Sequence, residues 1–131
     1  MIAKRKILVV DDNAGNRLLL KYNLEGYFDI DFASNGFSAI NKCRENIYDL
    51  IIMDVHMPEL DGIETTKQIR EMQNGKHTPI FAITSNMFRE QRIKCIEAGM
   101  DDYILKPIHA KALVERINLY FNTTSHYHEN Q

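Results

Sequence analysis

Several features that define large protein classes are scarce or missing in this chain. It has no tryptophan, three prolines and only two cysteines among 131 residues. Cys43 and Cys95 lack metal-ligand spacing, which excludes a disulfide-rich or zinc-stapled scaffold. Both fall in helical patterns, so we interpret them as small, buried, reduced residues. The chain has no internal repeat or low-complexity tract, and its length fits one domain.

An excess of charge of one sign is also missing. The formal net charge is −2, which gives no general attraction to nucleic acid or to an anionic lipid surface. No segment approaches the roughly 20 apolar residues of a membrane span. The apolar run after Lys4, Arg5 and Lys6 is soon interrupted by two acids, so it is too short for a secretion signal. We therefore predict a cytoplasmic protein without a direct nucleic-acid or membrane partner.

Short apolar runs alternate with helix-period segments along the whole chain. The runs are rich in Ile, Val, Leu and Phe and predict strands over residues 5–11, 29–33, 49–54, 79–84 and 102–105. Between and after them, apolar residues recur at spacings of three and four, as in Ile40, Cys43 and Ile47. This alternation predicts an α/β fold with parallel strands, right-handed crossovers and helices on both faces of the sheet.

Turn and capping residues agree with this division. Asn35-Gly36 separates the second strand from its helix, Asp61-Gly62 opens the third helix and Gly99 ends the fourth. Pro79 begins the fourth strand, where its missing N–H is tolerated. Residues 122–131 are polar and aperiodic, so we predict a domain over residues 1–121 followed by a disordered tail.

Acidic residues stand at the ends of two predicted strands. Asp11 and Asp12 follow the first strand, and Asp54 ends the third. The carboxyl ends of parallel strands open on one edge of the sheet, where such folds bind ligands. The second acid, or Asn13 after it, can cap the following helix, so capping accounts for one of these three residues. Three converging carboxylates repel one another, however, so they favour a site for a hard divalent cation, with Asp54 as a candidate nucleophile.

A hydroxyl and a lysine end two further strands on that edge. Thr84 ends the fourth strand, and Lys106 follows the fifth. Alone, each is an ordinary strand-end residue. Next to three acids and a cation, they are suited to hold phosphoryl oxygens. Tyr103, three residues before Lys106, is by itself a partly buried aromatic of an edge strand.

Taken in order, these residues resemble the receiver domain of two-component response regulators. The resemblance covers roughly residues 5–121 and is closest to the receivers of hybrid sensor kinases and phosphorelays, although stand-alone receivers share it. Several separated motifs in the same order make it specific. The segments that carry it are Ile7 to Asn13, Met53 to Gly62, Thr84-Ser85 and Ala98 to Ile108.

The resemblance implies a flavodoxin-like three-layer sandwich of five strand–helix units, with a parallel sheet in the strand order 2-1-3-4-5. It also implies that Asp54 accepts a phosphoryl group. Asp11, Asp12, Asp54 and the backbone carbonyl of His56 would hold Mg²⁺, and Lys106 would pair with the phosphate.

The same resemblance makes Thr84 and Tyr103 switch residues. The donor would be a sensor histidine kinase or a histidine phosphotransfer protein. Phosphorylation would change the face formed by the fourth helix, the fifth strand and the fifth helix, where a downstream protein binds. The chain would then be a signalling phosphoacceptor that catalyses only its own phosphoryl transfer and dephosphorylation, and not an enzyme with a separate substrate.

Three other functions compete with this interpretation. A phosphatase of the haloacid dehalogenase type needs a second Asp two residues after the nucleophile, where this chain has His56. A flavin-binding module needs a Ser-, Thr- and Gly-rich phosphate loop after the first strand, where Asp11 and Asp12 would repel phosphate. A purely structural interaction domain would leave the cost of three converging acids unexplained.

Overall fold

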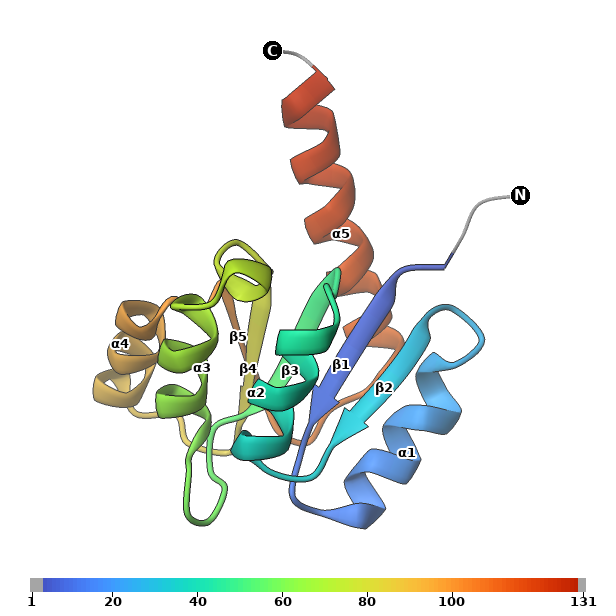
Figure 1. Cartoon of the computed structure of the whole chain (residues 1–131). Coiled ribbons are helices and arrows are strands. Elements are labelled where there is room, and N and C mark those ends of the chain that lie inside the picture. The colour runs from blue at the N-terminus through green and yellow to red at the C-terminus, as the bar shows by residue number, and fades with distance from the viewer. Residues whose placement is uncertain (1–3, 130–131) are drawn as a thin grey trace.

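A five-stranded parallel sheet forms the centre of the molecule (Figure 1). The computed structural model describes residues 4–129, and the side chains of residues 4–122. The strand order is β2-β1-β3-β4-β5, which confirms the flavodoxin-like topology. Each strand starts and ends within one residue of its predicted bounds: β1 (Lys6–Val10), β2 (Asp29–Ala33), β3 (Leu50–Asp54), β4 (Ile80–Thr84) and β5 (Asp102–Leu105).

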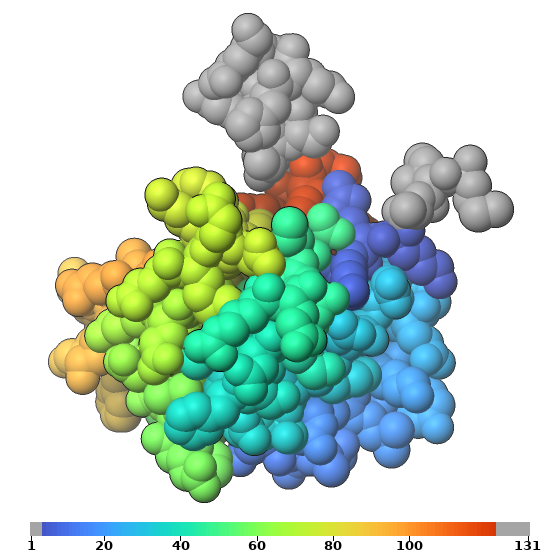
Figure 2. All heavy atoms as spheres, in the orientation of Figure 1, coloured from blue at the N-terminus to red at the C-terminus, as the bar shows by residue number. Residues whose placement is uncertain are grey.

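Helices cover both faces of the sheet and give the molecule three layers. Helices α1 (Ala14–Leu24) and α5 (Ala110–Glu129) pack against one face. Helices α2 (Gly36–Glu45), α3 (Gly62–Arg70) and α4 (Arg89–Ala98) pack against the other. On that second face α2 and α3 lie side by side (Figure 2). A short 3₁₀ turn, η1 (Gln73–Gly75), lies between α3 and β4.

From Ile7 onward, strand β1 is continuously apolar because both of its faces are buried. Leu8 and Val10 belong to the core under α2, α3 and α4, whereas Ile7 and Val9 belong to the core under α1 and α5. A strand buried on both faces has no position for a polar side chain until it leaves the sheet. The first polar side chains after β1 are therefore those of Asp11 and Asp12, at the edge where strands end.

The predicted caps are present at the helix ends. Asn13, Asn35 and Asp61 each accept a hydrogen bond from the backbone N–H three residues later, at 2.7–2.9 Å. Such caps satisfy N–H groups that have no partner within the helix. Gly99 ends α4 with a φ of 104°, a left-handed conformation that glycine adopts without strain.

Both cysteines are buried free thiols, as predicted. Burial raises the pKa of the Cys43 thiol to about 11 and also raises the pKa of Cys95. These thiols therefore stay protonated and unreactive near neutral pH.

Helix α5 corrects one expectation from the sequence. We expected aperiodic structure after residue 121, but α5 continues to Glu129. The run from Asn122 to Glu129 contains neither proline nor glycine, and extending an existing helix is far less costly than starting one. Residues 130–131 lie outside the described residues, and the domain boundary at residue 121 stays a prediction.

No helix in the described part of the chain is both long and apolar enough to cross a bilayer.

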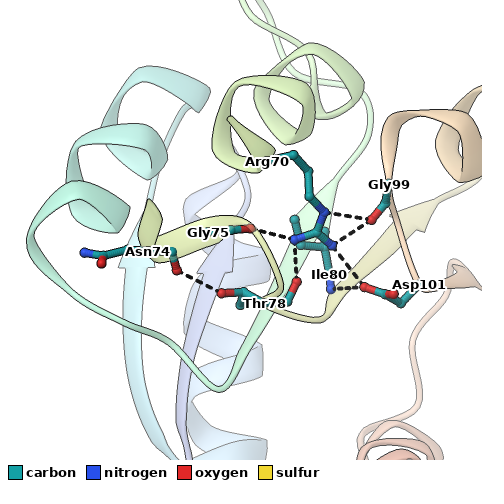
Figure 3. Close-up of polar contacts among 7 residues, drawn as sticks. All are labelled: Arg70, Asn74, Gly75, Thr78, Ile80, Gly99 and Asp101. Atoms are coloured by element: carbon teal, nitrogen blue, oxygen red, sulfur yellow. Dashed lines mark hydrogen bonds and ion pairs between the residues drawn. The ribbon is translucent and has the colours of Figure 1, made fainter. Parts of the chain in front are cut away.

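Arg70, the last residue of α3, ties together the end of the sheet opposite the strand-end acids (Figure 3). Its guanidinium donates hydrogen bonds to the carbonyl oxygens of Gly75, Thr78 and Gly99 at 2.6–3.1 Å. It also pairs with Asp101 at 3.1 Å, and the same Asp101 oxygen accepts from the N–H of Ile80, the first residue of β4. One side chain thus joins α3, η1, the loop before β4 and the turn before β5.

Replacing Arg70 should destabilise the fold strongly. In Arg70→Met, three backbone carbonyls lose their donor, and we expect the free energy of unfolding to fall by about 2–4 kcal/mol. Urea unfolding monitored by circular dichroism measures this. Lys67→Met, an exposed change on the same helix, is the control and should stay within about 0.5 kcal/mol. Equal stability of the two variants would contradict the role given to Arg70.

Thr66 of α3 should respond in the opposite direction. Its side chain is fully buried, and its hydroxyl has no hydrogen-bond partner among the residues that the structure describes. Thr66→Val keeps the shape and removes the unsatisfied group, so it should raise the unfolding free energy by about 1 kcal/mol. The neighbouring Thr65 hydroxyl donates to the Asp61 carbonyl at 2.7 Å, so Thr65→Val should destabilise. A loss of stability in Thr66→Val would refute this account.

Candidate functional site

Three carboxylates converge where β1 and β3 end. Because these strands are neighbours in the sheet, the residues that follow them meet at the same edge. One oxygen from each of Asp11, Asp12 and Asp54 lies within 4.8 Å of the others. Asp11 and Asp54 are each only 4% exposed, whereas Asp12 faces solvent. The structure therefore brings together all three acids that the sequence singled out.

Local hydrogen bonds hold Asp11 in place. Its Oδ1 accepts from the N–H of Asn13 at 2.9 Å, and its carbonyl accepts from Arg17 Nη1 at 2.7 Å. Asn13, and not Asp12, is the residue that caps α1. Neither acid is needed as the cap, so both remain available to a ligand.

Asp54 is a buried carboxylate with two weak stabilising contacts. Its Oδ1 accepts from the N–H of His56 at 3.2 Å, and Lys106 Nζ lies 3.4 Å from its Oδ2. Burial raises the pKa of Asp54, and the negative charge of Asp11 raises it further. Lys106 and the His56 N–H lower that pKa, but burial is the largest influence. The free site thus holds its central carboxylate in an unfavourable environment.

The donor set fits Mg²⁺. Hard divalent cations prefer carboxylate and carbonyl oxygens, and three carboxylate oxygens meet here without a nitrogen or sulfur ligand among them. The net negative charge of the acids exceeds what Lys106 alone can balance. Asp11, Asp12 and Asp54 could therefore hold such an ion, while a role for the His56 carbonyl stays a prediction.

Gly62 allows α3 to start directly against the end of β3. Its N–H donates to the Val55 carbonyl at 2.9 Å. A Cβ at this position would lie 2.2 Å from the Asp54 carbonyl oxygen, far inside contact distance. Only glycine fits this close approach, which helps fix the backbone that carries Asp54.

Thr84 and Tyr103 meet through the loop after β4. Thr84 is fully buried, and its hydroxyl accepts from the Asn86 N–H at 3.0 Å and from Gln91 Nε2 at 2.9 Å. The Tyr103 hydroxyl donates to the Asn86 carbonyl. The Lys106 N–H donates to the Thr84 carbonyl at 2.8 Å. Sequence reasoning missed Gln91, because a polar residue at the start of a helix carries no signal of its own.

A largely apolar groove of about 460 Å³ adjoins the acids. Asp11 and Lys106 are among the residues that line it. Leu19, which is 58% exposed, and Ile108 line its sides between α1 and the loop after β5. The sequence did not reveal this groove, because Leu19 reads as part of the buried face of a helix.

Comparison with known proteins gives one consistent family. The family model described as "Response regulator receiver domain" matches residues 7–118. A "Probable histidine kinase 1" of Oryza sativa subsp. indica is 36% identical over 89% of this chain and 15% of its own length. The "Transcriptional regulatory protein ResD" of Bacillus subtilis (strain 168) is 48% identical over 86% of this chain and 46% of its own.

A solved structure agrees with these relatives. It is the receiver domain of a sensor histidine kinase from Pseudomonas aeruginosa PAO1, with a magnesium ion coordinated in its active-site cleft. The TM-score is 0.80 at 35% identity, over 88% of this chain and 94% of that one. The present chain thus spans less than half the length of the two curated relatives.

The unfavourable environment of Asp54 predicts that Asp54→Asn stabilises the metal-free protein. An acid whose pKa is raised by folding costs stability while it is ionised. That cost is complete above its folded pKa and disappears as the pH falls through that value toward the unfolded pKa of about 4. Near pH 7.5 in EDTA we expect Asp54→Asn to gain about 0.5–2 kcal/mol.

Thermal unfolding of both proteins between about pH 7.5 and 5 tests this, and the gain should shrink toward the acid end. Asp29→Asn, an exposed acid at the start of β2, serves as the control with little effect. If Asp54→Asn were less stable than the wild type at neutral pH, the assigned electrostatics would be wrong.

Proposed function

Because the chain belongs to the response regulator receiver domain family of two-component systems, we propose that it accepts a phosphoryl group on Asp54. The observation that carries this proposal is one buried strand-end carboxylate, flanked by Asp11 and Asp12, with Lys106 Nζ at 3.4 Å. The two acids would hold Mg²⁺. The whole protein in which such a domain acts is a further proposal, because the chain covers only part of its curated relatives.

In the proposed reaction an Asp54 oxygen attacks the phosphorus of a phosphohistidine on a partner protein. An O–P bond forms and the P–N bond breaks, with its electron pair returning to the imidazole nitrogen. The product is an acyl phosphate on Asp54. The transition state of phosphoryl transfer is loose, so the protein contributes mainly alignment and charge neutralisation.

The surrounding residues have separate parts in this step. Asp11 and Asp12, with Asp54 and the His56 carbonyl, would hold Mg²⁺, which when bound supplies positive charge next to the phosphoryl oxygens. Lys106 neutralises one of these oxygens in a charge-assisted hydrogen bond. The Thr84 hydroxyl, on the adjacent strand β4, donates to another.

The acyl phosphate adds roughly two negative charges near Thr84. Movement of the Thr84 hydroxyl toward the phosphate would change the space next to Tyr103 on β5. The surface formed by α4, β5 and α5 would then shift between two arrangements, which is the signal that a downstream protein reads. Comparison of the Tyr103 ring in free and phosphorylated protein tests this part.

The partners follow from this chemistry. The donor would be a sensor histidine kinase or a histidine phosphotransfer protein. The relatives include a probable histidine kinase and a transcriptional regulatory protein, which supports a donor of this kind. The exposed apolar groove that Asp11 and Lys106 line is a suitable surface for the partner that carries the phosphohistidine, because Lys106 also contacts Asp54 at 3.4 Å.

Two further parts of the proposal concern scope and place. The domain would act on itself alone, through phosphorylation and dephosphorylation of Asp54, and not on a separate substrate. We place it in the cytoplasm, which the two free, buried thiols support.

The direct test is intact mass after incubation with acetyl phosphate. Wild-type protein with Mg²⁺ should gain one phosphoryl adduct, and the same protein in EDTA should gain at most about one tenth as much, because the acids remain unneutralised. Asp54→Ala should gain none, since the nucleophile is missing.

Asp29→Ala is the matched control, because it removes an exposed acid at the other end of the sheet. It should be phosphorylated like the wild type. A full adduct on folded Asp54→Ala would overturn the acceptor assignment, and no adduct on folded wild type would overturn the proposed function.

A further inference from the structure

Helix α4 is anchored unevenly. Its buried residues, Cys95 and Ala98, both lie in its C-terminal half. Its N-terminal half starts after Phe88, which has no side-chain oxygen to cap the helix, and its first two residues face solvent. Gln91 is the first residue of the helix that is partly buried. This half contacts the rest of the domain through the hydrogen bonds of Gln91 and through the Arg92 guanidinium, which lies 5.9 Å from the centre of the Tyr103 ring.

The Gln91 amide touches three groups around the proposed switch. Its Nε2 donates to the Thr84 hydroxyl at 2.9 Å and lies 3.5 Å from the Tyr103 hydroxyl. Its Oε1 accepts from Asn86 Nδ2 at 2.8 Å. The Asn86 carbonyl in turn accepts from the Tyr103 hydroxyl. A donor and an acceptor are both in use, which is what a neutral amide offers and a carboxylate does not.

These contacts constrain how the Thr84 hydroxyl can move. Its oxygen accepts from the Asn86 N–H and from Gln91, so both of its lone pairs are engaged and only its proton is free. If this hydroxyl turns toward a phosphoryl group on Asp54, the bond from Gln91 must break or the start of α4 must follow. Either result changes how α4 is held.

We propose that Gln91 is a positioning residue that couples the Thr84 hydroxyl to the N-terminal half of α4 and to Tyr103. This inference rests on the proposed function for its phosphoryl-dependent part. The coupling itself is a property of the unphosphorylated protein: Gln91 stabilises the start of α4 through Thr84, and the two residues act as one unit.

The first experiment measures the coupling between Gln91 and Thr84 in the unphosphorylated protein. Amide hydrogen exchange of the first α4 turns should be about three- to tenfold faster in Gln91→Met than in the wild type, the size expected for a lost hydrogen bond. Thr84→Val should speed exchange similarly. The effect of the double variant should be clearly smaller than the sum of the two single effects in free energy, because both substitutions remove the shared bond between Gln91 and Thr84. Glu97→Met, exposed on the same helix, should leave exchange unchanged.

The second experiment adds acetyl phosphate and Mg²⁺ and follows amide and Tyr103 signals by NMR, with intact mass as the measure of phosphorylation. In the wild type the signals of α4 and Tyr103 should shift together with the adduct. Gln91→Met should reach the same stoichiometry, since Gln91 does not touch Asp54, but its α4 signals should shift by less than about half as much.

The outcomes separate the two claims. If the wild type takes up no phosphoryl group, the proposed function fails. The hydrogen-exchange rates of the single and double variants then decide by themselves whether Gln91 and Thr84 are coupled. Additive effects of the Gln91 and Thr84 substitutions on exchange would overturn the coupling. So would a Gln91→Met protein whose α4 signals shift on phosphorylation as fully as those of the wild type.

Discussion

The crowding of Asp11, Asp12 and Asp54 at a single sheet edge is the electrostatic constraint around which the candidate site is built. Burial and the neighbouring acid raise the pKa of Asp54, so the ionised form of this carboxylate is destabilised in the metal-free protein. Stability alone would favour a neutral residue there. In the proposed function, a cation between the acids and the positive charge of Lys106 would turn the same arrangement into a favourable place for a phosphoryl group.

The fold provides this arrangement through its strand order. Strands β1 and β3 are neighbours, so acids about 40 residues apart in sequence end side by side, as parallel sheets generally place such residues. Strands β4 and β5 then bring Thr84 and Lys106 to the same edge. Gly62 keeps the backbone of Asp54 against α3. At the other end of the sheet, Arg70 holds the loops together through hydrogen bonds to the carbonyl oxygens of Gly75, Thr78 and Gly99. This structural role is therefore separate from the edge that carries the three acids.

Much of this could be predicted from the sequence, because each strand is marked by apolar residues and each strand end by a polar one. Asp11, Asp54 and Lys106 stood at such ends, and their meeting follows from the topology. The helical course of residues 122–129 could not be predicted, because polar residues carry no periodic signal although they allow a helix. Gln91 escaped notice for a related reason: its importance lies in three contacts with residues outside its own helix, in β4, β5 and the loop after β4, and helix periodicity does not encode them.

In the proposed function Asp54 carries the phosphoryl group, and chemical mapping of the modified residue is the decisive measurement. Borohydride reduces an acyl phosphate to an alcohol, which converts the modified aspartate into homoserine. After treatment with acetyl phosphate and Mg²⁺, tandem mass spectrometry of the reduced protein should find homoserine at position 54 and aspartate at positions 11 and 12. Homoserine at position 11 or 12, or a borohydride-resistant phosphoryl group on another residue with Asp54 unmodified, would contradict the account.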